Sequence, residues 1–160
     1  MAKKEDKTNV MRLLDTAGIP YTAHTYPTDG PIDGISVAAM VGRDAEQVFK
    51  TLVTRGASGA YYVFDVPAPD TLDLKKAARA VGEKSIAMIA QKELLPLTGY
   101  VHGGCSPLGM KKPFPTVFHE TVILFDTVCI SAGRIGAQVE AEPGALLALI
   151  GASTADITVD

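Results

Sequence analysis

The chain has 160 residues, of which 47% are hydrophobic and 21% charged, and its formal net charge is −3. This composition favours one globular domain over residues 1–160, with a core large enough to fold without disulfides. No apolar run approaches the ~20 residues that span a bilayer, and two cysteines are too few for a disulfide framework. The first residues, MAKKEDKTNV, mix charges of both signs, so we expect no signal peptide, no membrane partner and a reducing cytoplasm.

Hydrophobic spacing and turn residues predict the elements of the first half of the chain. They are a helix over 7–17 that ends at Gly18, a strand over 21–26, a loop over 27–34 and a short helix over 36–42 capped by Ser36. Two β-branched and aromatic runs around a Gly/Ser turn then predict a hairpin, with arms near 48–55 and 60–66.

The second half continues to mix helices and strands without a regular βα order. Asp73 is suited to cap a helix that ends at Gly82. The elements expected after it are a strand over 85–90, a helix over 91–99 broken late by Pro96, strands over 116–120, 121–126, 127–133 and 138–142, a helix from Pro143 to Gly151 and an edge strand over 155–159. This order favours an α+β fold with a mixed, mainly antiparallel sheet.

Charge is distributed unevenly along the chain. Residues 75–115 hold seven Lys or Arg and two acids, which gives +5, whereas residues 116–160 hold one Arg and six acids, which gives −5. A polarised molecule of this kind offers one basic face although its net charge is negative. The alternative is that these lysines are ordinary solvated side chains.

The glycine-rich stretch GYVHGGCSPLGMKK, from Gly99 to Lys112, is unsuited to a long helix or strand. One interpretation is a nucleophile, because Cys105 follows His102 by three residues and adjoins Ser106. An activated thiolate needs a neighbouring base or cation in defined geometry. The stretch also lacks the GxSxG elbow. These points argue against a protein nucleophile.

A second interpretation is a cradle for an anion or a carbonyl group. Glycines at 103, 104 and 109 allow the backbone to approach a ligand and to turn its amides inward, and Pro107 stiffens the loop. Lys111 and Lys112 follow as point charges for phosphate. Because neither Walker A nor GxGxxG fits, the sequence predicts no nucleotide cofactor. The remaining alternative is a tight structural turn.

Two further features concern histidines and a strand lysine. His24, His102 and His119 lie far apart and show no metal-ligand spacing, so we expect no metal site. Lys50 falls within an apolar predicted strand. Its side chain either points outward with the period of two, or places an ammonium in a pocket where it pairs with phosphate or carboxylate.

Three segments in this order resemble the YbaK family, which is similar to the editing domain of bacterial prolyl-tRNA synthetases. They are FKTLV around Lys50, LKKAARAVG from Leu74 to Gly82, and GYVHGGCSPLGMKK. The resemblance spans nearly the whole chain, from HTYP at His24 through ISAGRIG to the C-terminal helix. It implies a mixed, barrel-like sheet with flanking helices.

The resemblance also implies an activity: trans-editing hydrolysis of mischarged aminoacyl-tRNA, chiefly Cys-tRNA(Pro). A synthetase pocket discriminates poorly between near-isosteric amino acids, and a second hydrolytic site is the general remedy. In this family the substrate's own thiol is thought to attack the ester, while the protein supplies orientation and electrostatics. Prolyl-tRNA synthetase is implied as a partner in a ternary complex.

Site residues follow from the same resemblance. Lys50, Gly103, Gly104 and Ser106 are implied as catalytic, with Lys50 holding the 3′-terminal nucleotide and the loop holding the carbonyl or ribose. Residues implied in substrate binding are Tyr26, Cys105, Pro107, Lys111 and Lys112, and Lys75 and Lys76 are implied to attract the acceptor stem. The alternatives are a non-catalytic module that binds tRNA or a synthetase, a deacylase for another small amino acid such as alanine, and a small-molecule esterase that uses Ser106.

Overall fold

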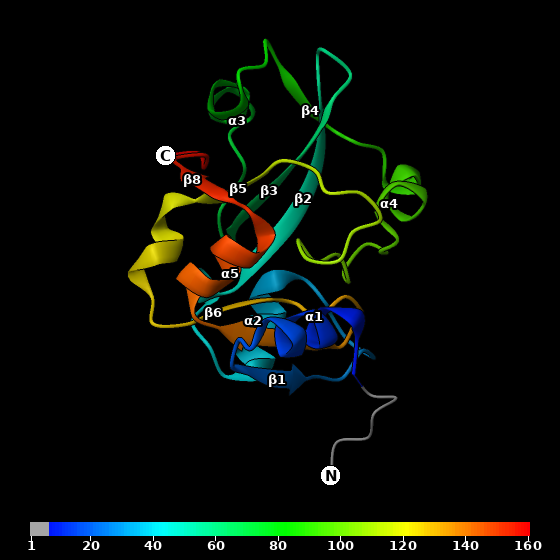
Figure 1. The fold of residues 1–160 in the computed structure, drawn as a ribbon, viewed down its shortest axis with the longest axis vertical. Helices are drawn as coiled ribbons and strands as arrows, with labels where there is room; N and C mark the ends of the chain where they lie inside the picture. The colour runs from blue at the N-terminus through cyan, green and yellow to red at the C-terminus, as the bar shows by residue number, and fades with distance from the viewer. Residues whose placement is uncertain (1–6) are drawn as a thin grey trace.

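The computed structural model describes residues 7–160 (Figure 1). Its strands form two sheets, one of three strands and one of five. The N-terminal residues 1–6, on which part of the signal-peptide expectation rests, lie outside the described residues. Within the described part, no helix has the length and apolar character needed to cross a bilayer.

The first sheet has three antiparallel strands in the order β1-β7-β6. Their bounds are β1 Tyr21–Thr25, β6 Val128–Ser131 and β7 Ala137–Ala141. Helix α1 (Asn9–Ala17) and helix α5 (Pro143–Ile150) pack against this sheet through a core that includes Val10, Leu14, Ile130, Val139 and Leu146, all at most 1% exposed.

The second sheet has five strands in the order β4-β2-β3-β5-β8. Their bounds are β2 Phe49–Gly56, β3 Tyr61–Pro67, β4 Ile86–Met88, β5 Thr116–His119 and β8 Ser153–Ala155. The pairs β3–β5 and β5–β8 are parallel, whereas β2 pairs antiparallel with β3 and β4. The expected mixed, mainly antiparallel α+β fold is confirmed, and the strands of the expected barrel-like sheet are divided between two sheets.

Two more helices flank the second sheet, and a further helix and two 3-10 segments complete the fold. Helix α3 (Leu74–Val81) packs through Ala77 and Ala78 onto Phe64 and Val66, and helix α4 (Gln91–Thr98) lies on the side of Val53 and Val63. Helix α2 (Gly34–Val41) and the 3-10 turn η2 (Ala45–Gln47) precede β2, and the 3-10 helix η3 (Glu120–Leu124) follows β5. Figure 1 shows β2 and β3 running from the first sheet up to α3 and β4.

Local signals in the sequence account for most helix ends. Gly18 ends α1 with φ of 71°, in the left-handed region that glycine tolerates best, and Asp73 caps α3 by accepting from the amides of Lys75 and Lys76. The prediction that Ser36 caps the second helix is wrong. Asp33 is the cap, and its carboxylate accepts from the amide of Ser36, so the helix begins at Gly34.

Three other predictions differ from the structure. Residues 121–126 are predicted to form a strand, but η3 occupies Glu120–Leu124, where Val122 is buried and Ile123 and Leu124 are exposed. Pro96 does not break α4, which continues to Thr98. The last strand lies at Ser153–Ala155, earlier than expected, and Thr158 forms only an isolated bridge to Leu72.

Candidate active site

A cavity of about 340 Å³ lies beside the first half of β2. Strand β4 pairs with β2 only over Thr54–Gly56, so the segment before it has no neighbouring strand of this sheet on that edge. The wall is completed by the start of α2, the loop after α4, and the ends of β6 and β7. A volume of this size is typical of small-ligand sites.

Lys50 on β2 lines this cavity and is the sole Lys or Arg among its lining residues in the described chain. Its ammonium donates to the carbonyl of Ala68 at 3.2 Å. Burial lowers the pKa of Lys50, while the more distant Asp70 acts in the opposite direction. Among residues 7–160 no carboxylate contacts this half-buried ammonium, so it is suited to meet an anionic or carbonyl oxygen of a ligand.

The glycine-rich loop brings Gly103 to the same cavity. Gly103 has φ of 86°, and a Cβ at this position would lie 2.8 Å from Cδ1 of Ile32. Gly104 meets a different constraint, because its Cβ would lie 2.8 Å from the amide nitrogen of Ile135. The amide of Gly104 is bonded to the carbonyl of Val101 at 3.0 Å. Gly103 therefore faces the ligand space, whereas Gly104 packs the loop against the turn between β6 and β7.

Four other residues predicted from this loop lie away from the cavity. Ser106 is 0% exposed, and its hydroxyl accepts from the amide of Leu108 at 3.3 Å. Pro107 and Lys112 line a second cavity of about 210 Å³ beside α5. Lys111 is exposed and reaches the carbonyl of Pro96. The structure thus separates these residues, with Gly104, from Lys50 and Gly103.

Cys105 lines the cavity but is only 8% exposed. Burial, with a smaller contribution from Asp65, raises the pKa of its thiol to about 12. A thiol with this pKa carries almost no thiolate at neutral pH, and thiolate is the nucleophilic form. Cys105 is therefore a wall residue rather than an activated nucleophile.

The remaining walls hold polar groups from distant parts of the chain. Tyr26, predicted from the sequence, lines the cavity and is 7% exposed. Ser131 and Gln138 are Cα partners on β6 and β7, and the buried Oε1 of Gln138 has no hydrogen-bond partner among the described residues. Sequence reasoning did not find Ser131 or Asp33, since their proximity to Lys50 depends on tertiary structure alone.

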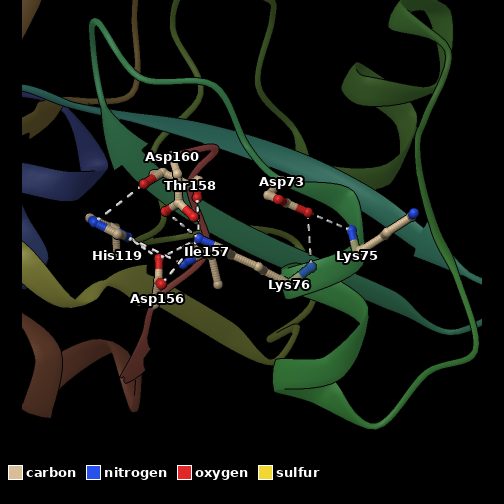
Figure 2. Close-up of polar contacts among 8 residues, drawn as sticks. All are labelled: Asp73, Lys75, Lys76, His119, Asp156, Ile157, Thr158 and Asp160. Atoms are coloured by element: carbon tan, nitrogen blue, oxygen red, sulfur yellow. Dashed lines mark hydrogen bonds and ion pairs between the residues drawn. The ribbon is translucent and has the colours of Figure 1, made fainter.

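The two lysines of α3 differ in their surroundings (Figure 2). The ammonium of Lys76 bonds to Asp160 at 2.8 Å, to Asp156 at 3.1 Å and to the carbonyl of Thr158 at 2.8 Å. Figure 2 shows that Lys75 points away from this cluster. Lys76 thus fastens the C-terminal segment to α3, and neither lysine lines the cavity.

His24, Cys129 and Glu140 bring one potential metal-ligand atom each within 4.8 Å of one another. The carboxylate of Glu140 is already bonded to Arg43, with both oxygens 3.0 Å from Nε, and to His24 at 2.7 Å. Burial would raise the pKa of Glu140, but the bonds from Arg43, Thr127 and His24 hold it at about 2. This arrangement is an ion-pair network, because the guanidinium occupies the oxygens that a metal would need.

Comparison with known proteins assigns the chain to a family. The family model for the aminoacyl-tRNA editing domain matches residues 32–149. A protein of Enterococcus faecalis named "Putative Cys-tRNA(Pro)/Cys-tRNA(Cys) deacylase EbsC" is 40% identical over 161 residues, which cover 99% of this chain and 98% of that protein. The chain belongs to the aminoacyl-tRNA editing domain family.

Solved structures agree with this assignment. One, described as "a putative trans-editing enzyme for prolyl tRNA synthetase", shares 31% identity and a TM-score of 0.83, covering 96% of this chain and 99% of that one. Another, the hypothetical protein APE2540, has a TM-score of 0.86 at 22% identity, covering 95% of this chain and 100% of that one, and shows the same fold. The resemblance seen in the sequence is confirmed, and the chain is an editing domain that acts on aminoacyl-tRNA.

Proposed function

We propose that this protein hydrolyses the ester bond of Cys-tRNA(Pro) and releases cysteine and uncharged tRNA. The observation that carries the proposal is that Lys50 and Gly103 line one cavity in a member of the editing family. The 40% identical relative, whose name assigns it Cys-tRNA(Pro) and Cys-tRNA(Cys), supports this choice of substrate.

The chemistry proposed is attack by the substrate's own thiol. Two candidate nucleophiles of the loop are unsuited to the task, since Ser106 is buried outside the cavity and burial raises the pKa of Cys105 to about 12. The substrate thiol loses its proton to solvent, and its sulfur bonds to the ester carbonyl carbon. The carbon–oxygen bond to the ribose then breaks, and the leaving oxygen takes a proton from water. Water opens the resulting cyclic thioester to give cysteine.

In this mechanism the protein contributes position and charge. Lys50 holds the negative oxygen of the terminal nucleotide or of the tetrahedral intermediate. The backbone at Gly103 contacts the ester, and Tyr26 and Cys105 form walls of the space for the aminoacyl group. Lys111 and Lys112, exposed outside the cavity, attract the acceptor end through its phosphates. Gly104, Ser106 and Pro107 support the shape of the loop.

The same proposal includes a partner and a place of action. Selection of proline tRNA is supplied by prolyl-tRNA synthetase in a ternary complex, in keeping with the structural relative described as a trans-editing enzyme for that synthetase. Such an activity belongs in the compartment where tRNA is charged, the cytoplasm.

A deacylation panel tests the proposal. The purified protein is incubated with Cys-tRNA(Pro), Ala-tRNA(Pro), Pro-tRNA(Pro) and Cys-tRNA(Cys), with and without the synthetase, and the remaining ester is measured over time. Cys-tRNA(Pro) is expected to be hydrolysed and Pro-tRNA(Pro) to be spared. Preferential loss of Ala-tRNA(Pro) would assign an alanine deacylase. Salt-sensitive tRNA binding without hydrolysis of any ester would assign a binding module.

A further inference from the structure

Asp65 lies at the centre of the five-stranded sheet, where a carboxyl group is unusual. It is 0% exposed, and its Cα partners are Thr51 on β2 and Phe118 on β5. Its neighbours along β3, Phe64 and Val66, are also 0% exposed. An unpaired carboxylate in such surroundings is costly, so the group either finds a cation or keeps its proton.

The described residues supply one hydrogen bond and no cation. The hydroxyl of Thr51 bonds to Oδ1 at 2.6 Å, and Oδ2 has no partner. Burial raises the pKa of Asp65 to about 8, and the bond from Thr51 only partly offsets this effect. Burial and the missing cation therefore favour the protonated form of this carboxyl group at neutral pH.

The groups that face Asp65 from each neighbouring element do not change this conclusion. From β2, the ammonium of Lys50 bonds instead to the carbonyl of Ala68. From β5, Phe118 is uncharged, and the ring of the adjacent His119 is bonded to the amide of Ile157 at 3.2 Å. From the glycine-rich loop comes the thiol of Cys105, whose pKa is itself raised in part by Asp65.

Asp65 also lies directly behind the cavity wall. It does not line the cavity, but its hydrogen-bond partner Thr51 and its electrostatic neighbour Cys105 both do. The hydrogen bond that the Thr51 hydroxyl donates to Asp65 selects one orientation of the Thr51 side chain. If the carboxyl lost its proton, a negative charge without a counterion would lie beneath both wall residues.

We propose that Asp65 is a positioning residue of this site: its buried carboxyl accepts the hydrogen bond that holds Thr51 on the cavity wall, and loss of the carboxyl proton, which leaves an unpaired charge beneath that wall, inactivates the site. This inference rests on the proposed deacylase function and adds a built-in alkaline limit to it. Asp65 does not touch the substrate and acts through Thr51 and the shape of the wall.

The test compares pH profiles of kcat for Cys-tRNA(Pro) hydrolysis, between about pH 6 and about pH 9.5 and corrected for spontaneous ester cleavage. The wild type should lose activity above about pH 8. Asp65→Asn keeps the shape and an oxygen for Thr51 but has no ionisable proton, so it should remain active at neutral pH and lack the alkaline decline. An unchanged decline in Asp65→Asn would overturn the proposal.

Further variants show which residue causes the alkaline decline. Lys50→Arg should keep the alkaline decline, because a guanidinium does not titrate in this range. If the alkaline decline were absent in Lys50→Arg but present in Asp65→Asn, the titrating group would be Lys50. Thr51→Val and Asp65→Val should each lower kcat, and the double variant should lose no more than one of them, because both remove the same hydrogen bond.

A stability measurement keeps the inference testable if a variant is inactive. Since the folded-state pKa of Asp65 lies above its value in the unfolded chain, the wild type should lose stability as pH rises from about 4 to about 8. The Tm of Asp65→Asn relative to wild type should therefore increase over this window. A difference that stays flat would overturn the inference. No hydrolysis by the wild type at any pH would instead overturn the proposed function.

Discussion

Lys50 on β2 and Gly103 in the loop after α4 line the same cavity, although the hairpin, α3, β4 and α4 separate them in the chain. The ammonium group and the turned backbone thus approach one ligand space from two different elements. This pairing is the physical basis of the proposed ester hydrolysis.

Replacement of Lys50 by alanine tests the cationic half of this pair. We expect Lys50→Ala to lower kcat/KM for Cys-tRNA(Pro) by about 10²–10³-fold, the range for removing one group that stabilises developing charge. Folding should be unaffected, because Lys50 makes a single bond, to the Ala68 carbonyl. Single-turnover deacylation measures the effect. Lys84→Ala, at an exposed position outside the cavity, is the matched control and should leave the rate unchanged.

A methyl group at residue 103 tests the backbone half. Gly103→Ala combines a φ of 86° with a close approach to Ile32, so it should displace the loop and lower deacylation strongly. Gly151→Ala is the matched control, because its φ is 75° but nothing lies within 4 Å of the new Cβ, and it lies outside the cavity. Both variants should lose about 1 kcal/mol or more of stability from backbone strain. Equal activity in the two variants would argue that the backbone at residue 103 does not contact the substrate ester.

The network at Glu140 predicts how stability responds to acid. Hydrogen bonds from Arg43, Thr127 and His24 hold the folded pKa of Glu140 at about 2, below the ordinary value of 4.5 for a glutamate side chain. A depressed pKa stabilises the fold above about pH 4.5, and the contribution, about 3 kcal/mol, is lost as pH falls towards about 2. Thermal unfolding from about pH 7 to about pH 2.5 should show this loss in the wild type.

Two variants distinguish the contribution of Glu140 to the acid dependence of Tm from that of an exposed acid. Glu140→Gln should flatten the acid dependence of Tm, whereas Glu120→Gln, at an exposed site on η3, should leave the dependence as it is. A wild-type Tm that does not fall between about pH 4.5 and about pH 2 would contradict the assignment.

Replacing the two neighbouring lysines of α3 should affect stability differently. Lys76→Ala removes the bonds to Asp156, Asp160 and the Thr158 carbonyl that hold the C-terminal segment, so its Tm should fall (Figure 2). Lys75→Ala breaks no side-chain bond in the structure, so its Tm should match wild type. Binding of uncharged tRNA at several salt concentrations completes the comparison. If tRNA binding by Lys76→Ala depended less on salt than binding by the wild type, the Lys76 ammonium would contact a tRNA phosphate despite its ion pairs.

Local chemistry explains which parts of the fold were predictable from the sequence. Gly18, Asp73 and Pro143 act through neighbours within a few residues, so their helix ends were predicted correctly. Residues 121–126 were assigned to a strand because they are apolar and β-branched. Whether such a segment pairs depends on a partner strand elsewhere, and here the chain forms η3 and leaves Ile123 64% exposed.

The residues of the candidate site were likewise predictable only in part. The motif around Lys50 and the glycine-rich stretch pointed to two walls of the cavity, and both Lys50 and Gly103 line it. The stretch did not reveal which loop residues face inward, so Gly104 and Ser106 were grouped with Gly103 although both pack elsewhere. In the sequence Asp65 is only one acid in an apolar run. Its burial and its contact with Thr51 depend on how β2, β3 and β5 pair, which the sequence does not show.

The central claim is most directly tested by comparing Cys-tRNA(Pro) with Ser-tRNA(Pro), which differ only by sulfur and oxygen in the side chain. The first-order rate of ester loss is measured for each with excess protein. If the cargo's thiol performs the attack on an ester held by Lys50 and Gly103, the cysteinyl ester should be cleaved far faster than the seryl ester. Equal rates for the two esters would contradict the account, because the protein or water would then supply the nucleophile.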